Sequence, residues 1–423
     1  MSYLKPLSQI IPVIALVFTI SISQETGNLA NAAQSFEPSP LEIPIKDPLI
    51  PSLKRPLTPF EVRRLREALD ELDTQAKAQL DAGNTDGAFE IWYRELRLRR
   101  FLGNLEEIQA LGRVGAIAWD KSRTQDVKNI STRLVLVQQQ AQQKGPLTPQ
   151  LLDAFATAYQ QLRKIDQSIN IQQQILANAR QQGDLPTQTK ALTTIGDLYL
   201  SRFDYGKAAP IYEDLLKIAQ SQQDSYQEGI YLKQLAEIYS ETLQPANAVK
   251  IKEDLANNYL KNQQIQSIPD IKILIGQDYD TLNQPEKASQ NFQEAFSLAW
   301  ALQQYGAAGK ALTQLGDLYR KYKQDDYALQ IYGELIKVEQ RSYNYYGLMN
   351  AYDKIGEIYL SKNNYSSAIA AFQQGLELAR AISYNENYFM TKIDQANQKK
   401  NAPTSAPTPA PIPTPAPTSP QNR

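Results

Sequence analysis

The chain has 423 residues, a formal net charge of −1, and neither cysteine nor histidine. The balanced charge provides no field that would attract nucleic acid. Without Cys there are no disulfides or thiolate metal sites, and without His the commonest general base is missing. We therefore expect a protein that is not an enzyme, that uses no cofactor and that binds no nucleic acid.

Residues 1–32 are expected to direct export. Lys5 precedes an apolar run from Ile10 to Ile22, which has the length of a signal-peptide core and is shorter than the roughly 20 residues of a membrane span. Ala30-Asn31-Ala32 then offers a cleavage site between small residues. We predict a cleaved signal peptide, with an uncleaved membrane anchor as the alternative. Either one indicates an exported protein, in the periplasm or anchored and facing it.

Residues 33–58 are expected to form a proline-rich linker. Proline recurs between residues 38 and 59, and it lacks the amide hydrogen that a helix interior or a sheet requires. An extended spacer is therefore predicted. Thr58-Pro59-Phe60-Glu61 then begins a helix, since it combines a capping box with proline at the first helical position.

One dense basic cluster follows in the first helical unit. It consists of Arg94, Arg97, Arg99 and Arg100, with Glu95 between them. We expect a solvated helix face, and a phosphate-binding patch is the alternative.

A period of forty residues runs along the chain to about residue 382. A small residue, a tyrosine three positions later and an alanine twelve positions later recur in the same register. Such a period indicates a repeat array, in which each unit buries its apolar face against its neighbours. The positions are Gly196, Tyr199 and Ala208; Ala236, Tyr239 and Ala248; Gly276, Tyr279 and Ala288; Gly316, Tyr319 and Ala328; and Gly356, Tyr359 and Ala368.

Each unit is predicted to be a pair of antiparallel helices. Apolar residues recur at spacings of three and four, the helical period, in two stripes separated by a short polar stretch. The small residue and the alanine would let the two helices approach closely, with the tyrosine filling the neighbouring gap. Weaker copies extend the array back to residue 59, which predicts eight units and a capping helix over residues 59–399.

These residues resemble the tetratricopeptide repeat (TPR) family, whose signature is Leu-Gly, two residues, Tyr, then Ala, three residues and an aromatic. Leu315-Gly316, Tyr319, Ala328 and Tyr332 supply it here. The family's period is 34 residues, and a period of 40 also falls in the HEAT and armadillo range, so a HEAT-like solenoid is the structural competitor. The resemblance implies an all-α fold, an α-solenoid wound as a right-handed superhelix.

In the family that this chain resembles, the residue after the small one points into the concave face. Chaperone-binding members have Asn there, to clamp a terminal carboxylate; this chain has mostly acids, which puts such clamping in doubt. A basic or polar peptide segment of a partner protein is favoured instead, with a solvated face or a divalent cation as alternatives. The candidate partner-binding residues are Asp197, Glu237, Glu241, Gln277, Asp280, Asp317, Arg320 and Glu357.

Residues 400–423 are expected to be a disordered tail rich in Pro, Thr and Ala. In the polyproline II conformation, at about 3.1 Å per residue, residues 402–420 could reach roughly 60 Å. A solvated spacer is the expected role, and a ligand for a proline-binding groove or a strut through the cell wall is the alternative.

Together these features predict an exported, non-catalytic scaffold that binds other proteins. Two alternatives remain open. One is an assembly factor for a membrane complex, such as a photosystem II maturation factor with possible delivery of a divalent metal, because the TPR family includes exported members with that role. The other is a periplasmic cell-wall enzyme.

Overall fold

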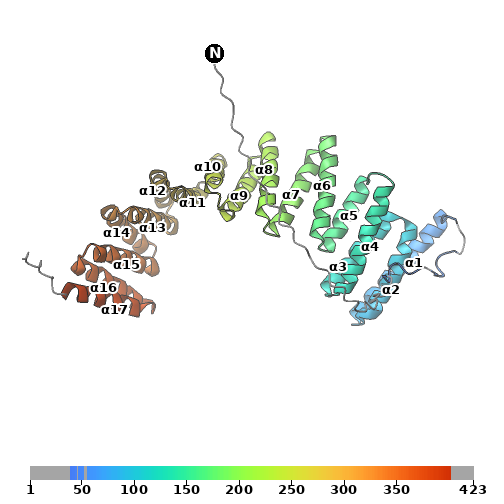
Figure 1. Ribbon diagram of the computed structural model, residues 1–423, viewed down its shortest axis with the longest axis horizontal. Coiled ribbons are helices and arrows are strands. Elements are labelled where there is room, and N and C mark those ends of the chain that lie inside the picture. The colour runs from blue at the N-terminus through green and yellow to red at the C-terminus, as the bar shows by residue number, and fades with distance from the viewer. Residues whose placement is uncertain (1–38, 45, 52–54, 402–423) are drawn as a thin grey trace, which may run out of the picture.

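The computed structural model describes residues 39–44, 46–51 and 55–401. The expected signal sequence or anchor at 1–32 and the tail after residue 401 lie outside the described residues. In the described part the chain forms 17 α-helices and no strand, and the helices follow one another along an open arc (Figure 1). The prediction of an all-α solenoid is confirmed.

The helices form eight consecutive hairpins, and each helix packs against the next one in the chain, except that α5 packs against α3 rather than α4. A seventeenth helix closes the array. The hairpins are α1 (Pro59–Asp81) with α2 (Thr85–Arg99), α3 (Asn104–Asp120) with α4 (Thr124–Gln143), α5 (Pro149–Gln161) with α6 (Ile165–Gln182), α7 (Leu185–Leu200) with α8 (Tyr205–Ser221), α9 (Ser225–Glu241) with α10 (Pro245–Lys261), α11 (Ile268–Thr281) with α12 (Pro285–Ala301), α13 (Tyr305–Lys321) with α14 (Asp325–Arg341), and α15 (Tyr345–Ser361) with α16 (Tyr365–Ala381). The short 3-10 helices η1 (Arg100–Leu102) and η2 (Ile265–Ser267) precede α3 and α11, and the closing helix is α17 (Glu386–Asn401).

The helices end in a repeated turn. At the end of α7 the amides of Asp204 and Phe203 donate to the carbonyls of Tyr199 (3.0 Å) and Leu200 (2.9 Å), the bond pattern of a Schellman motif. Phe203 lies in the left-handed region, with φ of 58°. From residue 203 onward, a left-handed residue recurs every 20 positions and ends each helix, so the helices begin at regular intervals. These residues are Phe203, Gln223, Leu243, Gln263, Asn283, Gln303, Lys323, Tyr343, Asn363 and Ser383.

In four of the hairpins the small residue lies against an aromatic ring of the second helix. A Cβ added to Gly316 would lie 2.8 Å from Cζ of Tyr332, whose side chain is fully buried. The tyrosine three positions after the glycine, which we expected to fill the neighbouring gap, does not occupy this space. The aromatic residue sixteen positions later fills it, because the second helix carries its ring directly over the missing side chain. The other pairs of this kind are Gly196 with Tyr212, Gly276 with Phe292 and Gly356 with Phe372.

The tyrosine three positions after the small residue joins consecutive hairpins instead. The Tyr279 hydroxyl donates to Glu253 (2.7 Å), which lies in the preceding hairpin, and Tyr239 donates in the same way to Glu213. Burial, strengthened by these hydrogen bonds, raises the pKa of both tyrosines to about 12. The hydroxyls therefore stay protonated and can donate throughout the physiological range.

The α9–α10 hairpin departs from this pattern. Ala236 replaces the glycine, and Lys252 takes the place of the aromatic ring. Lys252 is 4% exposed, and its ammonium group donates to Asp278 of α11 at 2.7 Å. A buried ion pair that links two hairpins thus replaces ring packing within one hairpin.

The described part of the linker lies against the first two hairpins. Leu41 is fully buried among residues of this part of the core, and Asp47 accepts two hydrogen bonds from Arg94, at 2.7 and 3.1 Å. The hydrogen bond from Arg94 is the main cause that lowers the pKa of Asp47. Arg97 donates to the carbonyl of Pro40 at 2.9 Å, and Arg100 to that of Leu41. This stretch is therefore attached to the array along its length.

The basic cluster is consequently not a solvated face, contrary to our expectation. Glu95 is fully buried and Arg99 is 7% exposed, and the two form an ion pair at 3.0 Å. Arg99 also reaches Asp70 of α1 at 2.7 Å and Glu106 of α3 at 3.0 Å. Glu95 lies one turn before Arg99 in α2, but Asp70 and Glu106 come from other helices, so the sequence alone does not reveal the whole network.

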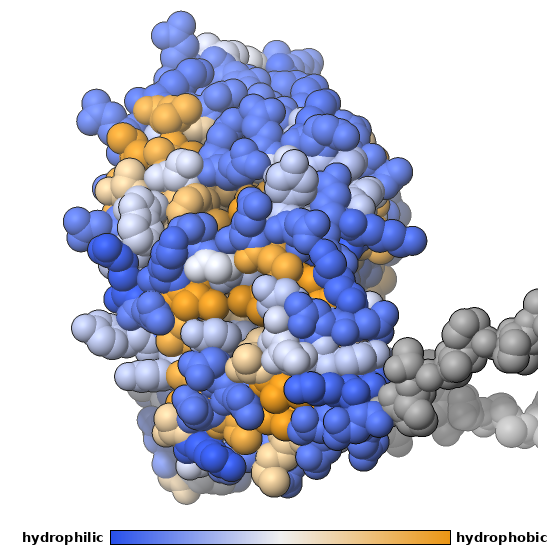
Figure 2. Space-filling view, turned by 90° about the vertical axis from the view of Figure 1, so that its left-hand side faces the viewer, coloured by the Kyte–Doolittle hydropathy of each residue, from blue (hydrophilic) through white to orange (hydrophobic). Residues whose placement is uncertain are grey.

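Helix α17 covers the far end of the array. Phe389 is 1% exposed and packs its ring against Gly375 of α16. Figure 2 views this end of the molecule, where hydrophilic residues predominate and apolar residues gather in bands between them. A terminal helix with a polar outer face is what keeps a repeat array soluble.

Candidate functional site

The first helices of the hairpins line the inner side of the arc. In Figure 1, α11 and α13 lie toward the hollow and α12 and α14 on the outside, and α11 contacts α13 directly. The predicted partner-binding residues all lie on these inner helices. They are Asp197 on α7, Glu237 and Glu241 on α9, Gln277 and Asp280 on α11, Asp317 and Arg320 on α13, and Glu357 on α15.

In the C-terminal half, the predicted acids pair with lysines of the next hairpin. Asp280 contacts Lys321 at 2.7 Å, and Asp317 contacts Lys354 at 2.5 Å. Glu357 pairs with Lys392 of α17 and lies 3.9 Å from Arg320. These contacts connect successive inner helices, and they neutralise much of the negative charge that we expected this part of the groove to present.

Two predicted acids also have a structural role. The hydroxyl of Tyr212 donates to Asp197 at 2.7 Å, and that of Tyr332 donates to Asp317 at 2.5 Å. Both tyrosines are the rings that pack on the small residue. In the hairpins where that ring is Phe292 or Phe372, the matching position is Gln277 or Glu357. The aspartate therefore accompanies a buried tyrosine hydroxyl that requires an acceptor.

The other predicted residues do not gather into one cluster. Glu237 and Glu241 are exposed on α9, and among the described residues neither forms an ion pair. Gln277 donates to Gln314 of α13 at 3.2 Å. Nowhere in the described ranges do three or more carboxylates lie together as a group that could hold a metal ion.

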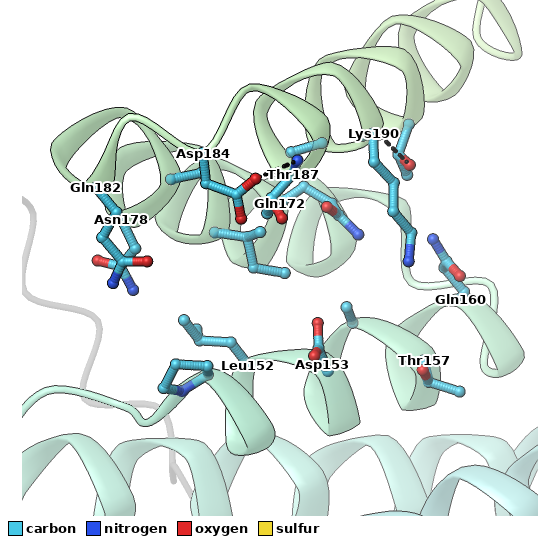
Figure 3. Close-up of a pocket in the computed structure, with 16 residues that line it drawn as sticks. Leu152, Asp153, Thr157, Gln160, Gln172, Asn178, Gln182, Asp184, Thr187 and Lys190 are labelled. Atoms are coloured by element: carbon cyan, nitrogen blue, oxygen red, sulfur yellow. Dashed lines mark hydrogen bonds between the residues drawn. The ribbon is translucent and has the colours of Figure 1, made fainter.

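A hollow on the inner side lies between α5, α6 and α7, outside the region that the sequence highlighted (Figure 3). Its volume is about 620 Å³. Asp153, Thr157 and Gln160 face it from α5, and Lys190 approaches Gln160 from α7 on the opposite wall. The carboxamides of Gln172, Asn178 and Gln182 on α6 complete its polar lining.

The hollow continues in both directions along α5. A second cavity of about 610 Å³ shares Gln160 and Thr194 with the first and extends to Asp197. A third, of about 410 Å³, lies between α3 and α5 and shares Asp153 and Thr157. The three cavities adjoin one another around α5, and we call them together the α5 groove. Of the residues predicted to bind a partner, Asp197 alone lines it.

A short helix and small side chains leave the groove open at this point. Helix α5 has 13 residues, whereas the neighbouring α6 and α7 have 18 and 16. Ala156 and Ala191 leave room where the walls face each other. At the equivalent place further along, Asp317 and Lys354 close the space between α13 and α15.

The polar groups of the groove can bind a peptide backbone. A carboxamide both donates and accepts, as a peptide unit does, and Gln160 is exposed. Asp184 is already engaged, because it caps α7 by accepting from the amide of Thr187 at 3.1 Å, and the hydrogen bonds from Thr187 lower its pKa. Asp153 and Lys190 form no ion pair among the described residues. They remain available for a ligand.

Sequence reasoning missed the α5 face although a signal was present. Thr157 follows the small residue Ala156, as Asp197 follows Gly196 forty residues later. Asp153 and Gln160 lie four residues before and three residues after Thr157, so the three share one helix face. The acidic pattern directed the prediction to later units, where lysines pair with Asp280, Asp317 and Glu357.

One family model matches the chain. It is described as "Tetratricopeptide repeat", and it covers residues 350–382, which lie in α15 and α16. The α15–α16 hairpin is a tetratricopeptide repeat. The resemblance to the TPR family is thereby confirmed over the HEAT-like competitor, and the other units repeat the same small residue, tyrosine and alanine in the same register.

Solved structures similar to this array share little sequence with it. BtubC from P. vanneervenii is 18% identical with a TM-score of 0.38, and the match covers 52% of this chain and 92% of that one. A kinesin light chain with TPR-like repeats from Podosopora anserina is 14% identical, with a TM-score of 0.35 and coverage of 46% and 95%. A TPR protein from Cytophaga hutchinsonii is 13% identical, with a TM-score of 0.40 and coverage of 67% and 99%.

A search of curated proteins found no significant match to the sequence. Within the described residues, none of the helices combines the length and the apolar character needed to cross a membrane.

Proposed function

We propose that the protein is an exported scaffold that holds an extended, polar segment of a partner protein in its concave face, with the α5 groove as the main contact. The observation that carries this proposal is the groove itself, a long hollow whose walls come from successive inner helices. An elongated groove with mixed polar and apolar walls suits an extended chain better than a compact small molecule, which pockets usually enclose more completely.

The lining supports recognition of a peptide backbone combined with selected charges. The carboxamides of Gln160, Gln172 and Asn178 can pair with peptide N–H and C=O groups. Asp153 and Asp197 would favour a basic side chain, and Lys190 an acidic one. In the C-terminal half the acids are already paired, which supports a polar partner segment rather than a strongly basic one.

Export and the absence of catalysis belong to the same proposal. The apolar run that follows Lys5 supports export to the periplasm. A scaffold role is supported by the lining of the α5 groove, where Asp184 is engaged as a helix cap and Asp153 is not buried. Affinity would come from a few anchor contacts within the groove rather than from its total area.

Photo-crosslinking tests the proposal in living cells. Benzoylphenylalanine at Thr157, in the groove, should form a crosslink to a partner protein, and mass spectrometry should place the linked residue in an extended polar segment. The matched control is Gln173, which is exposed on α6 and lies outside the cavity lining. Equal crosslinking from Thr157 and Gln173, or none from Thr157 in the presence of the native partners, would contradict the proposal.

A further inference from the structure

Exposed tyrosines gather at the turns that connect the last hairpins. Tyr343 is 79% exposed, Tyr345 49%, Tyr346 52% and Tyr384 47%. Tyr343 and Tyr384 lie in the turns from α14 to α15 and from α16 to α17, and Tyr345 and Tyr346 begin α15. The two turns face the same edge of the array because both connect a second helix to the next first helix. We call these four residues the tyrosine edge.

Two rings of the edge are in contact. The rings of Tyr346 and Tyr384 contact each other across the two turns, with centroids 5.7 Å apart and planes at 62°. One turn earlier, Trp300 packs edge-on against Tyr305 at 5.6 Å. The guanidinium of Arg341, two residues before Tyr343, lies over the Trp300 ring at 5.1 Å.

The same edge carries little charge. Ser-Tyr-Asn occurs twice, at 342–344 and 383–385, and Glu386 is the charged residue that follows the second copy. Glu386 lies 3.7 Å from Arg380 of α16. Exposed aromatic rings that gather in an uncharged patch indicate a binding surface.

Such a surface fits proline-rich segments in particular. Flat aromatic rings separated by shallow gaps are the usual receptors for polyproline II ligands, because proline packs well on aromatic faces and such a segment loses little conformational entropy. The tyrosine hydroxyls can donate to the ligand's carbonyls, which have no internal partners in this conformation.

The chain contains a segment with this chemistry. Residues 402–420 alternate Pro with Ala and Thr and contain no charged residue. The described chain ends at Asn401, at the end of α17, and α17 begins two residues after Tyr384. The 16 residues of α17 span about 24 Å, at 1.5 Å per residue. Residues 402–420 could span roughly 60 Å, so they are long enough to return along α17.

We propose that the tyrosine edge binds the chain's own proline-rich tail, residues 402–420. This site is at the end of the array opposite the α1 end, on the C-terminal hairpins, and it is independent of the α5 groove. Its failure would leave the proposed partner-binding function untouched.

Distance measurements on the full chain test the proposal. The chain has no cysteine, so nitroxide labels can be placed at Ser419→Cys in the tail and at Lys337→Cys on α14. The Lys337 side chain is 65% exposed and pairs only with Glu334 of its own helix among the described residues. Double electron–electron resonance should give one narrow distance peak. Substituting Tyr343→Ser with Tyr345→Ser should replace that peak by a broad distribution.

The control substitutes exposed residues on the opposite edge. Phe203 and Leu243 are 76% and 86% exposed, and both occupy left-handed turn positions, as Tyr343 does. Phe203→Ser with Leu243→Ser should leave the narrow peak unchanged, and circular dichroism should show that both variants are folded.

Three outcomes would overturn the proposal. The first is a broad distribution in the unsubstituted chain, and the second is a narrow peak that survives the tyrosine substitutions. The third is a narrow peak that disappears when labelled protein is diluted with unlabelled protein, since the tail of a second copy would then be the occupant.

Discussion

Gly316→Ala is the most direct test of how the helices pack. The added Cβ would lie 2.8 Å from Cζ of Tyr332, closer than side-chain carbons approach, and the ring cannot withdraw easily because it is fully buried and its hydroxyl is bonded to Asp317. Overpacking of this kind costs about 1–3 kcal/mol. Alanine also favours a helix over glycine by about 1 kcal/mol, so the two effects oppose each other.

Gly333→Ala provides the matched control. Gly333 lies inside α14, in the same hairpin, and a Cβ there would meet no atom within 4 Å. Both substitutions gain the same helix propensity, and only Gly316→Ala meets the ring. The free energies of unfolding of the two variants should therefore differ by the overpacking cost alone, about 1–3 kcal/mol.

Urea unfolding followed by circular dichroism measures this difference. Because repeat arrays can open in parts, hydrogen exchange of the α13 and α14 amides should accompany it. We expect Gly333→Ala to raise the unfolding midpoint and slow exchange in this hairpin, and Gly316→Ala to do neither. Equal stabilisation by both substitutions would refute the role that we assign to the small residue.

Three further predictions concern buried polar groups. Burial raises the pKa of Glu339, which is 6% exposed; its folded pKa then exceeds the unfolded one, so native stability is lost as the pH rises through the folded pKa. Glu339→Gln should remove this pH-dependent loss of stability, which urea midpoints measured between about pH 4 and 8 should show. If the variant kept the pH profile of the unsubstituted chain, the role assigned to Glu339 would be contradicted. Tyr332→Phe should cost about 1–2 kcal/mol in urea unfolding, through the lost bond to Asp317, and no loss would show that the bond contributes nothing. Lys252→Ala should cost about 1–3 kcal/mol because the partly buried Asp278 would lose its partner, whereas Lys252→Met with Asp278→Leu should recover most of the thermal stability. A double variant as unstable as the single one would contradict the ion-pair explanation.

The helical architecture was readable from the sequence because each element repeats. Apolar spacing, the small residue and the alanine recur in register, so the pattern of one unit identifies the helices of the next. The contacts of the tyrosines were not readable. Tyr279 reaches Glu253 in the preceding hairpin, and nothing in the local pattern shows which neighbour a side chain meets when both faces of a hairpin are covered.

The candidate site was only partly predictable for a related reason. The residues after the small position do lie on the first helices of their hairpins, but whether an acid there is free depends on the next hairpin. Lys354, 37 residues later in the chain, forms an ion pair with Asp317. The α5 groove, in turn, exists because α5 is short and the side chains between α5 and α7 are small. A motif search does not detect such an opening.

Isothermal calorimetry of the partner segment identified by crosslinking tests the central claim most directly. The synthetic segment would be titrated into the full chain, into Thr157→Trp, which fills the α5 groove, and into Gln173→Trp on the outer face of α6. We predict that Thr157→Trp weakens binding by at least about tenfold, equivalent to 1.4 kcal/mol, and that Gln173→Trp leaves it unchanged. Equal affinity for Thr157→Trp and the unsubstituted chain would show that the segment binds elsewhere.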